Sequence, residues 1–185
     1  MALLGMRAAP TADKTDPAPA APGSVVVGLG EAKVVTRAST EDCLVAYGLG
    51  SCVVICLWDP SAGVAGMAHV VLPGADPTGV ANPKFARSAL PALVALMQAH
   101  GAASDPRRYV ARLAGGAEVL AIGGTGKLPR IGEQNAAAVR DALVSAGVTI
   151  QAEDLGGTRG RSVWFDPREG GQVRVRVVGS NERNL

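Results

Sequence analysis

The chain has 185 residues, 48% of them hydrophobic, and its 18 basic and 16 acidic residues leave a formal net charge of +2. A chain of this length forms one domain that is stable without disulfides or metals. The charges show no basic stripe interleaved with aromatic residues, which argues against nucleic-acid binding. No apolar run is long enough to span a membrane, and the first residues lack the apolar core of a signal peptide. We therefore expect a cytoplasmic protein without membrane insertion.

The N-terminal residues are rich in proline and alanine and have no apolar period. Such a segment buries too little surface to offset the entropy lost on ordering. We therefore predict a disordered tail over residues 1–23, a folded domain over 24–178, and a flexible C-terminal end over 179–185.

The first half of the folded part is predicted to consist mostly of strands, because short β-branched and apolar runs alternate there with Gly, Pro and Asp. The predicted strands cover residues 25–27, 32–36, 43–47, 52–58 and 64–72. A helix follows, with Asn82 as its cap, and ends before Gly101.

The second half mixes both element types. Strands are predicted over residues 109–113, 118–122, 148–152, 162–165 and 173–178, with a helix over 133–146. Strands first and mixed elements afterwards favour the α+β class over a regular alternation with a parallel sheet.

Three cysteines are present, Cys43, Cys52 and Cys56, so they cannot all pair with each other. None has the CxxC spacing of a structural zinc site. We expect reduced thiols and no metal. Cys43 and Cys56 are interpreted as packing residues, whereas Cys52 follows the glycine-rich GLGS and begins a predicted strand.

A predicted hairpin brings Cys52 toward a histidine. Asp59 and the proline after it favour a type I turn, and a loop over residues 59–62 would place Trp58 opposite Gly63. In that register Cys52 stands directly opposite His69, with Cβ atoms about 4.5–5.5 Å apart. A change of one residue in the loop would send them to opposite faces.

A cysteine beside an imidazole can lose its proton and act as a nucleophile in a thiolate–imidazolium pair. The backbone amides around Gly50 and Ser51 are candidates for binding the oxyanion that forms. The competing interpretation is a glycine-rich turn followed by a cysteine that only packs. His100 is explained by the end of the first helix, where a cation interacts favourably with the helix dipole.

Three glycine-rich segments resemble nucleotide-binding motifs without completing them. GGTGKLP over residues 123–129 lacks the first glycine and the Ser or Thr of a phosphate loop, and the segments over 28–33 and 48–53 lack the third glycine of a dinucleotide fingerprint. We expect no nucleotide cofactor.

Five segments in fixed order, GLGSCVVICLWDP, GMAHVVLP, LAGGAEV, IGEQNAAAVRDAL and AEDLGGTRGRSVWFD, resemble the CheD family of chemoreceptor glutamine deamidases over residues 25–178. The resemblance implies a layered β-sandwich core of mixed sheets flanked by helices, similar to the fold of cytotoxic necrotizing factor-type deamidases. It implies hydrolysis of glutamines on methyl-accepting chemotaxis receptors through a thioester on Cys52, with His69 as general base and without metal or organic cofactor.

The family pattern usually has a threonine that orients the histidine, at the position that Ala46 occupies here. This departure keeps a second function open, a weakly catalytic or non-catalytic regulator that binds receptors and a CheC-type phosphatase. A third is a deamidase of another protein. Asn135, Arg159 and Arg161, with the loop over 115–135, are candidates for substrate binding. The competing interpretations are that the arginines are solvated surface residues and that Asn135 caps or shapes this loop.

Overall fold

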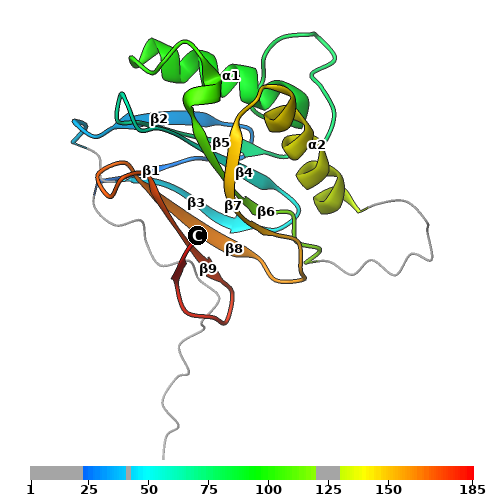
Figure 1. Ribbon diagram of the computed structural model, residues 1–185. Coiled ribbons are helices and arrows are strands. Elements are labelled where there is room, and N and C mark those ends of the chain that lie inside the picture. Colours follow the sequence, from blue (N-terminus) through cyan, green and yellow to red (C-terminus); the bar gives the residue numbers. More distant parts are fainter. Residues whose placement is uncertain (1–22, 41–42, 120–129) are drawn as a thin grey trace, which may run out of the picture.

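The computed structural model describes residues 23–40, 43–119 and 130–185. Two five-stranded sheets lie one on the other, and two helices cover one of them (Figure 1). The outer sheet has the strand order β1-β3-β8-β9-β10, and the helix-covered sheet has the order β2-β5-β4-β6-β7. Among the described residues, no helix has the length and apolar character needed to cross a membrane.

The elements have the following bounds. The outer sheet consists of β1 (Ser24–Val26), β3 (Cys43–Leu49), β8 (Arg161–Asp166), β9 (Gln172–Val177) and β10 (Arg183–Asn184). The helix-covered sheet consists of β2 (Ala32–Thr36), β4 (Val53–Asp59), β5 (Val64–Val70), β6 (Val110–Gly115) and β7 (Thr149–Leu155). The helices are α1 (Ala86–Ala99), the 3-10 helix η1 (Pro106–Arg108) and α2 (Ile131–Ser145).

Strand β4 lies in the middle of the helix-covered sheet and is buried along its whole length. Its residues alternate between two cores: Val53 and Ile55 pack with the helices, whereas Val54 and Cys56 pack with the outer sheet. A strand that is covered on both faces needs apolar residues at every position. This requirement explains the unbroken run VVICLW in the sequence.

Both sheets are mixed, as the predicted α+β class allows. Most neighbours in each sheet are antiparallel, but β1 pairs with β3 and β6 pairs with β7 in parallel. Parallel neighbours need a long crossover connection, and α2 supplies it between β6 and β7. The structure therefore confirms a mixed α/β architecture with two sheets and two helices, with both helices on one face.

The predicted hairpin forms, but its register was wrong by two residues. Trp58 lies opposite Ala65 and Asp59 lies opposite Val64, so the loop covers residues 60–63. Asp59 remains in the strand because its carboxylate accepts the N–H of Ser61 at 2.9 Å and that of Ala103 at 2.7 Å. Gly63 closes the loop with φ +67°, a conformation that glycine adopts without strain.

The first helix begins later than predicted. Phe85 is its N-cap, and Asn82 instead shapes the preceding turn, where its Oδ1 accepts the N–H of Lys84 at 3.0 Å. Of the strand predicted over 118–122, Glu118 and Val119 lie outside any strand, and residues 120–122 lie outside the described part of the chain. Nearly all of the predicted tail and all of the GGTGKLP segment also lie outside it.

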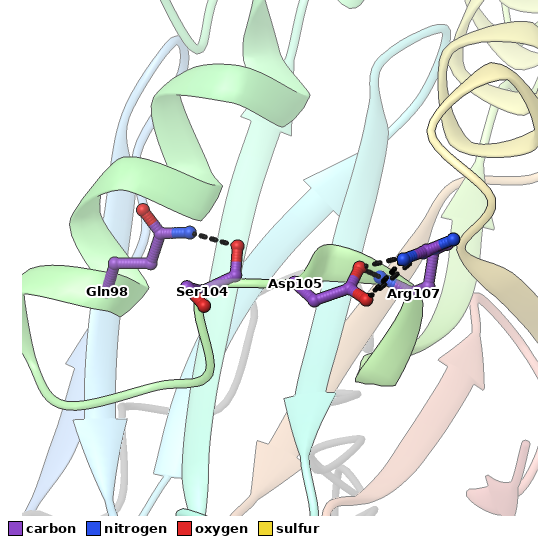
Figure 2. Close-up of polar contacts among 4 residues, drawn as sticks. All are labelled: Gln98, Ser104, Asp105 and Arg107. Carbon is purple, nitrogen blue, oxygen red and sulfur yellow. Dashed lines mark hydrogen bonds and ion pairs between the residues drawn. The ribbon is translucent and has the colours of Figure 1, made fainter.

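A short connection leads from α1 into β6 and is fixed by local polar contacts (Figure 2). Gln98 donates from Nε2 to the carbonyl oxygen of Ser104 at 3.0 Å. Asp105 caps η1, accepting the N–H of Arg107 at 3.0 Å and pairing with its guanidinium at 2.8 Å. Because the side chains of Asp105 and Arg107 are well exposed, this pair shapes the turn more than it stabilises the fold.

Candidate active site

Cys52 lies immediately before β4 and is half-buried. The chain reaches it from β3 through an irregular stretch, because the pairing of β3 with β8 shifts register between Ala46 and Leu49. Gly48 lies in this shift with φ +65°. Register shifts of this kind redirect the side chains that follow them, and here the chain turns from the outer sheet into the helix-covered sheet at the thiol.

The three carbonyl groups around the thiol are all bound by the protein. Their partners are Ala117 N at 2.7 Å from Gly50 O, Asn135 Nδ2 at 2.9 Å from Ser51 O, and Gly116 N at 2.7 Å from Cys52 O. In a trans peptide the N–H points away from the preceding carbonyl. The N–H groups of Ser51 and Cys52 therefore point away from these partners, and no other described residue accepts a hydrogen bond from either. Only the thiol of Cys52 interacts with its own N–H.

Two glycines at the end of β6, Gly115 and Gly116, allow the backbone to pack this closely against Cys52. A Cβ on Gly115 would lie 2.1 Å from Cys52 O, and the residue has φ +125°. Gly116 also has a positive φ, +68°, and a Cβ on it would lie 3.0 Å from Gly132 O. The segment LAGGAEV therefore needs its glycines, because the backbone of residues 115–117 packs directly on residues 50–52, which we call the cysteine loop.

His69 is a β5 residue with 3% of its surface exposed. Its Nδ1 lies 3.1 Å from the carbonyl oxygen of Val27. A carbonyl only accepts, so the neutral ring carries its hydrogen on Nδ1 and its lone pair on Nε2. Nε2 is buried and has no hydrogen-bond partner. The ring is therefore held by one nitrogen and free to take a proton on the other.

The carbonyl that holds His69 is itself fixed by β3. Val27 is 1% exposed, and its N–H donates to Val45 O at 2.8 Å. Ala46 follows Val45 and is fully buried between the sheets. The backbone beside Ala46 thus holds Val27, whose carbonyl oxygen accepts from the imidazole, although the side chain at position 46 has no polar group.

Cys52 and His69 share one face of the sheet but are not directly opposite. His69 pairs with Val54. If this register is extended beyond the strand, Cys52 lies opposite Val71, two residues from His69. Because the observed register differs from the predicted one by two residues, the two side chains stay on the same face of the sheet. This face points toward the outer sheet. Diagonal neighbours of this kind are about 7–8 Å apart. No hydrogen bond joins the two side chains in this resting arrangement.

Burial shifts the pKa values of both groups in favour of their neutral forms. It raises the pKa of the Cys52 thiol above its ordinary value of 9.0, while the N–H of Cys52 opposes this shift. It lowers the pKa of His69 below 6.5, against the effects of Val27 O and the Glu31 carboxylate. The predicted thiolate–imidazolium pair is thus disfavoured at rest.

Asn135 reaches Ser51 from α2. The sequence pointed to Asn135 as a substrate-binding or loop-shaping residue, but did not predict this contact. Asn135 is fully buried, and its Nδ2 donates to Ser51 O at 2.9 Å and to Val71 O at 3.0 Å. No part of it is exposed to a substrate. The sequence did indicate that Asn135 faces the core, because it lies four residues before Val139 and residues four apart share one side of a helix.

The two candidate arginines differ in exposure. Arg161 is 3% exposed, and its guanidinium binds Asp154 and the carbonyl of Gly156. It therefore cannot act as a surface arginine, which corrects the expected substrate contact. Arg159 is exposed, with one hydrogen bond, to Val178 O at 3.1 Å.

His100 lies at the C-terminal cap of α1, as expected, with Nδ1 2.9 Å from Leu96 O. It takes no part in the site. Across residues 23–40, 43–119 and 130–185, no group of three His, Cys, Asp or Glu side chains gathers in a way that could hold a metal ion.

The fold and the site define a β-sandwich protein with a cysteine just before one strand and a histidine in the neighbouring strand, both on one face of the sheet. A family model described as CheD chemotactic sensory transduction matches residues 71–177. The chain belongs to the CheD family.

Named relatives extend this match across the site. A probable chemoreceptor glutamine deamidase CheD of Symbiobacterium thermophilum is 40% identical over 166 residues, covering 86% of this chain and 95% of its own length. One of Archaeoglobus fulgidus is 40% identical over 146 residues, covering 79% and 88%. The chemoreceptor glutamine deamidase CheD of Halalkalibacterium halodurans is 36% identical over 166 residues, covering 87% and 98%. An alignment over 86% of the chain includes positions 52 and 69 wherever it begins.

Proposed function

We propose that the chain hydrolyses glutamine side chains of methyl-accepting chemotaxis receptors to glutamate and ammonia, with Cys52 as nucleophile and His69 as general acid–base. Membership of a family whose named relatives are chemoreceptor glutamine deamidases supports the reaction. The observation that carries the residue assignment is the free, buried Nε2 of His69 on the same sheet face as the Cys52 thiol.

The reaction begins with attack of the Cys52 sulfur on the carboxamide carbon while the thiol proton passes to Nε2 of His69. The C–N bond of the tetrahedral intermediate then breaks, and the amide nitrogen leaves as ammonia with the proton from Nε2. A thioester remains. Water attacks this thioester after giving a proton to Nε2, and breakage of the C–S bond releases glutamate and the thiol, which recovers its proton.

The oxyanion of the intermediate needs donors that are fixed before the reaction. The N–H groups of Ser51 and Cys52, which no other described residue accepts, meet this need, because the carbonyls of Gly50 and Ser51 are bound on the opposite side of the loop. Donors that do not have to reorganise contribute most to the rate. Gly50 contributes no side chain that would cover them.

Val27 O takes the orienting role that the family resemblance gives to a threonine at position 46. It fixes the tautomer of His69 and favours the imidazolium that forms during attack. The distance between the thiol and Nε2 has to shorten when substrate binds, as catalytic hydrogen bonds often do.

Substrate contact outside the reacting groups is assigned to Arg159, which is exposed near the end of β9 and suits the acidic and amide-rich surface of a receptor. We place the protein in the cytoplasm, where free thiols stay reduced. Its fold is expected to be of the cytotoxic necrotizing factor type. The same surface that meets receptors would also bind a CheC-type phosphatase.

The test replaces each reacting group. Cys52→Ala and His69→Gln should each lower ammonia release from a receptor fragment by about a thousandfold or more. The mass change from amide to acid should disappear as well. Cys56→Ala, on the same sheet face but fully enclosed, is the control and should keep its activity. Ammonia release by Cys52→Ala at the original rate would reject the mechanism.

One alternative is favoured by a specific observation: no hydrogen bond joins Cys52 to His69. A regulator that binds receptors and a CheC-type phosphatase needs no such bond. In that case the original protein releases no ammonia, while it and Cys52→Ala bind the receptor fragment equally.

A further inference from the structure

We propose that Asn135 is a positioning residue, whose side-chain amide fixes the cysteine loop against the end of β5 and so aims an oxyanion donor. This role rests on the mechanism proposed above. Asn135 does not touch the reacting atoms and acts through the backbone.

The amide bridges the two segments where the sheet stops joining them. The pairing of β4 with β5 ends at Val53 and Val70. Beyond it, the N–H of Val71 donates to Lys84 O at 2.9 Å, outside the hairpin. Asn135 donates to Ser51 O and Val71 O at this point. One side chain thus replaces the missing ladder bond between the segment before Cys52 and the segment after His69.

The orientation of the Asn135 amide follows from its partners. Both are carbonyl oxygens, which only accept, so the NH₂ end has to face them. Both of its hydrogens are then used, and Oδ1 is left buried with no partner. A buried acceptor without a donor lowers stability. An apolar residue would avoid this penalty, as Ala136 and Val139 do on the same helix, so the amide is best explained by its two bonds.

The helix that carries Asn135 is fixed to the same loop. The N–H of Gly132 donates to Glu118 Oε1 at 3.0 Å, and a Cβ on Gly132 would lie 2.4 Å from Gly116 O. Gly116 in turn donates to Cys52 O. The first turn of α2, the 115–117 segment and the cysteine loop are therefore in direct contact, and the position of Asn135 is determined by this contact.

The effect on chemistry follows from a shared peptide group. The carbonyl of Ser51 and the N–H of Cys52 belong to one planar unit. Holding Ser51 O fixes the direction of the Cys52 N–H, one of the two proposed oxyanion donors. This donor matters when charge develops on the substrate oxygen, and little in the ground state. Loss of the amide should therefore lower kcat and leave KM nearly unchanged.

The test compares Asn135→Ala and Asn135→Asp with the original protein in receptor-fragment deamidation. An aspartate has the same shape but lacks the two amide hydrogens: burial favours its protonated form, which can donate to only one of the two carbonyls. We expect kcat to fall by about tenfold to a hundredfold in both, with KM within about twofold. Val139→Ala is the matched control, because it removes packing on the same helix without touching either carbonyl. It should lower the melting temperature and keep kcat.

The outcomes separate this proposal from the one on which it rests. Cys52→Ala is measured in the same assay. If it is inactive while Asn135→Ala keeps its kcat, the positioning role is overturned and the mechanism stands. An equal loss of kcat in Val139→Ala would show a merely structural effect and also overturn it. If Asn135→Asp does not fold, Asn135→Ala decides alone. Activity in Cys52→Ala would reject both proposals.

Discussion

At the scale of single residues, burial shifts the pKa values of the two proposed reacting groups in opposite directions. Burial disfavours charge, so it raises the pKa of a thiol and lowers that of an imidazole. Cys52 and His69 show these two shifts. The sequence could supply the residue types and their shared face. It could not supply the shifts, which depend on how deeply two packed sheets enclose each group.

The pH dependence of the reaction should follow from these shifts. In the proposed mechanism a neutral His69 accepts the proton, so activity should be present above the lowered pKa of His69 and lost as the pH falls through it. The lower limb of kcat/KM should therefore lie below pH 6.5, and the upper limb, set by Cys52, above pH 9.0. A profile of kcat/KM against pH measures both. A lower limb at or above pH 6.5 would contradict the neutral resting pair.

At the scale of elements, the hairpin shows what a sequence pattern determines and what it leaves open. Asp59 and its proline correctly predicted a turn between two strands. The register depended on whether Asp59 belonged to the turn or to the strand, and its hydrogen bond from Ala103 N settles this. Ala103 is 44 residues away in the chain, so a local turn rule could not include it. The shared face survived because the error was an even number of residues.

The close contact between the 115–117 segment and Cys52 can be tested by substitution. Gly115→Ala puts a Cβ at 2.1 Å from Cys52 O, on a backbone with φ +125°. Either the loop or β6 must move, so we expect a loss of about 3 kcal/mol in the free energy of unfolding. Activity should fall more than stability explains. Gly74→Ala is the control, since nothing lies within 4 Å of its added Cβ. Denaturant titration measures the stability of each variant, and a deamidation assay measures its activity. A Gly115→Ala variant with unchanged stability and activity would contradict this tight contact.

At the scale of the whole molecule, strand and helix content followed from local patterns, but the assignment of strands to two sheets did not. Strands β2 and β3 are consecutive in the chain and lie in different sheets. Nothing in their residues marks the change, because both sheets face the same apolar layer. The same limit applies to Arg161. Its charge suggested a surface role, and only the stacking of the sheets encloses it.

Arg161 links the two sheets through a buried ion pair. Asp154 of β7, in the helix-covered sheet, binds Arg161 of β8 and also Arg183 of β10, both in the outer sheet. Removing one partner of a buried pair costs more than removing an exposed one, since the other charge remains enclosed. When Arg161 is removed, Arg183 still pairs with Asp154. The loss of stability should therefore lie at the lower end of the range for buried ion pairs.

Arg161→Met should therefore lower the free energy of unfolding by about 3 kcal/mol. The loss should persist at high salt, because buried pairs are screened much less than exposed ones. Arg159→Met, two residues away on the surface, should change stability by less than about 0.5 kcal/mol and instead raise KM for a receptor fragment at low salt. Urea titrations of both variants at low and high salt measure the difference. If Arg161→Met were as stable as Arg159→Met, the sheets would be joined by apolar packing alone, and Arg161 would again be a candidate for contact with the substrate.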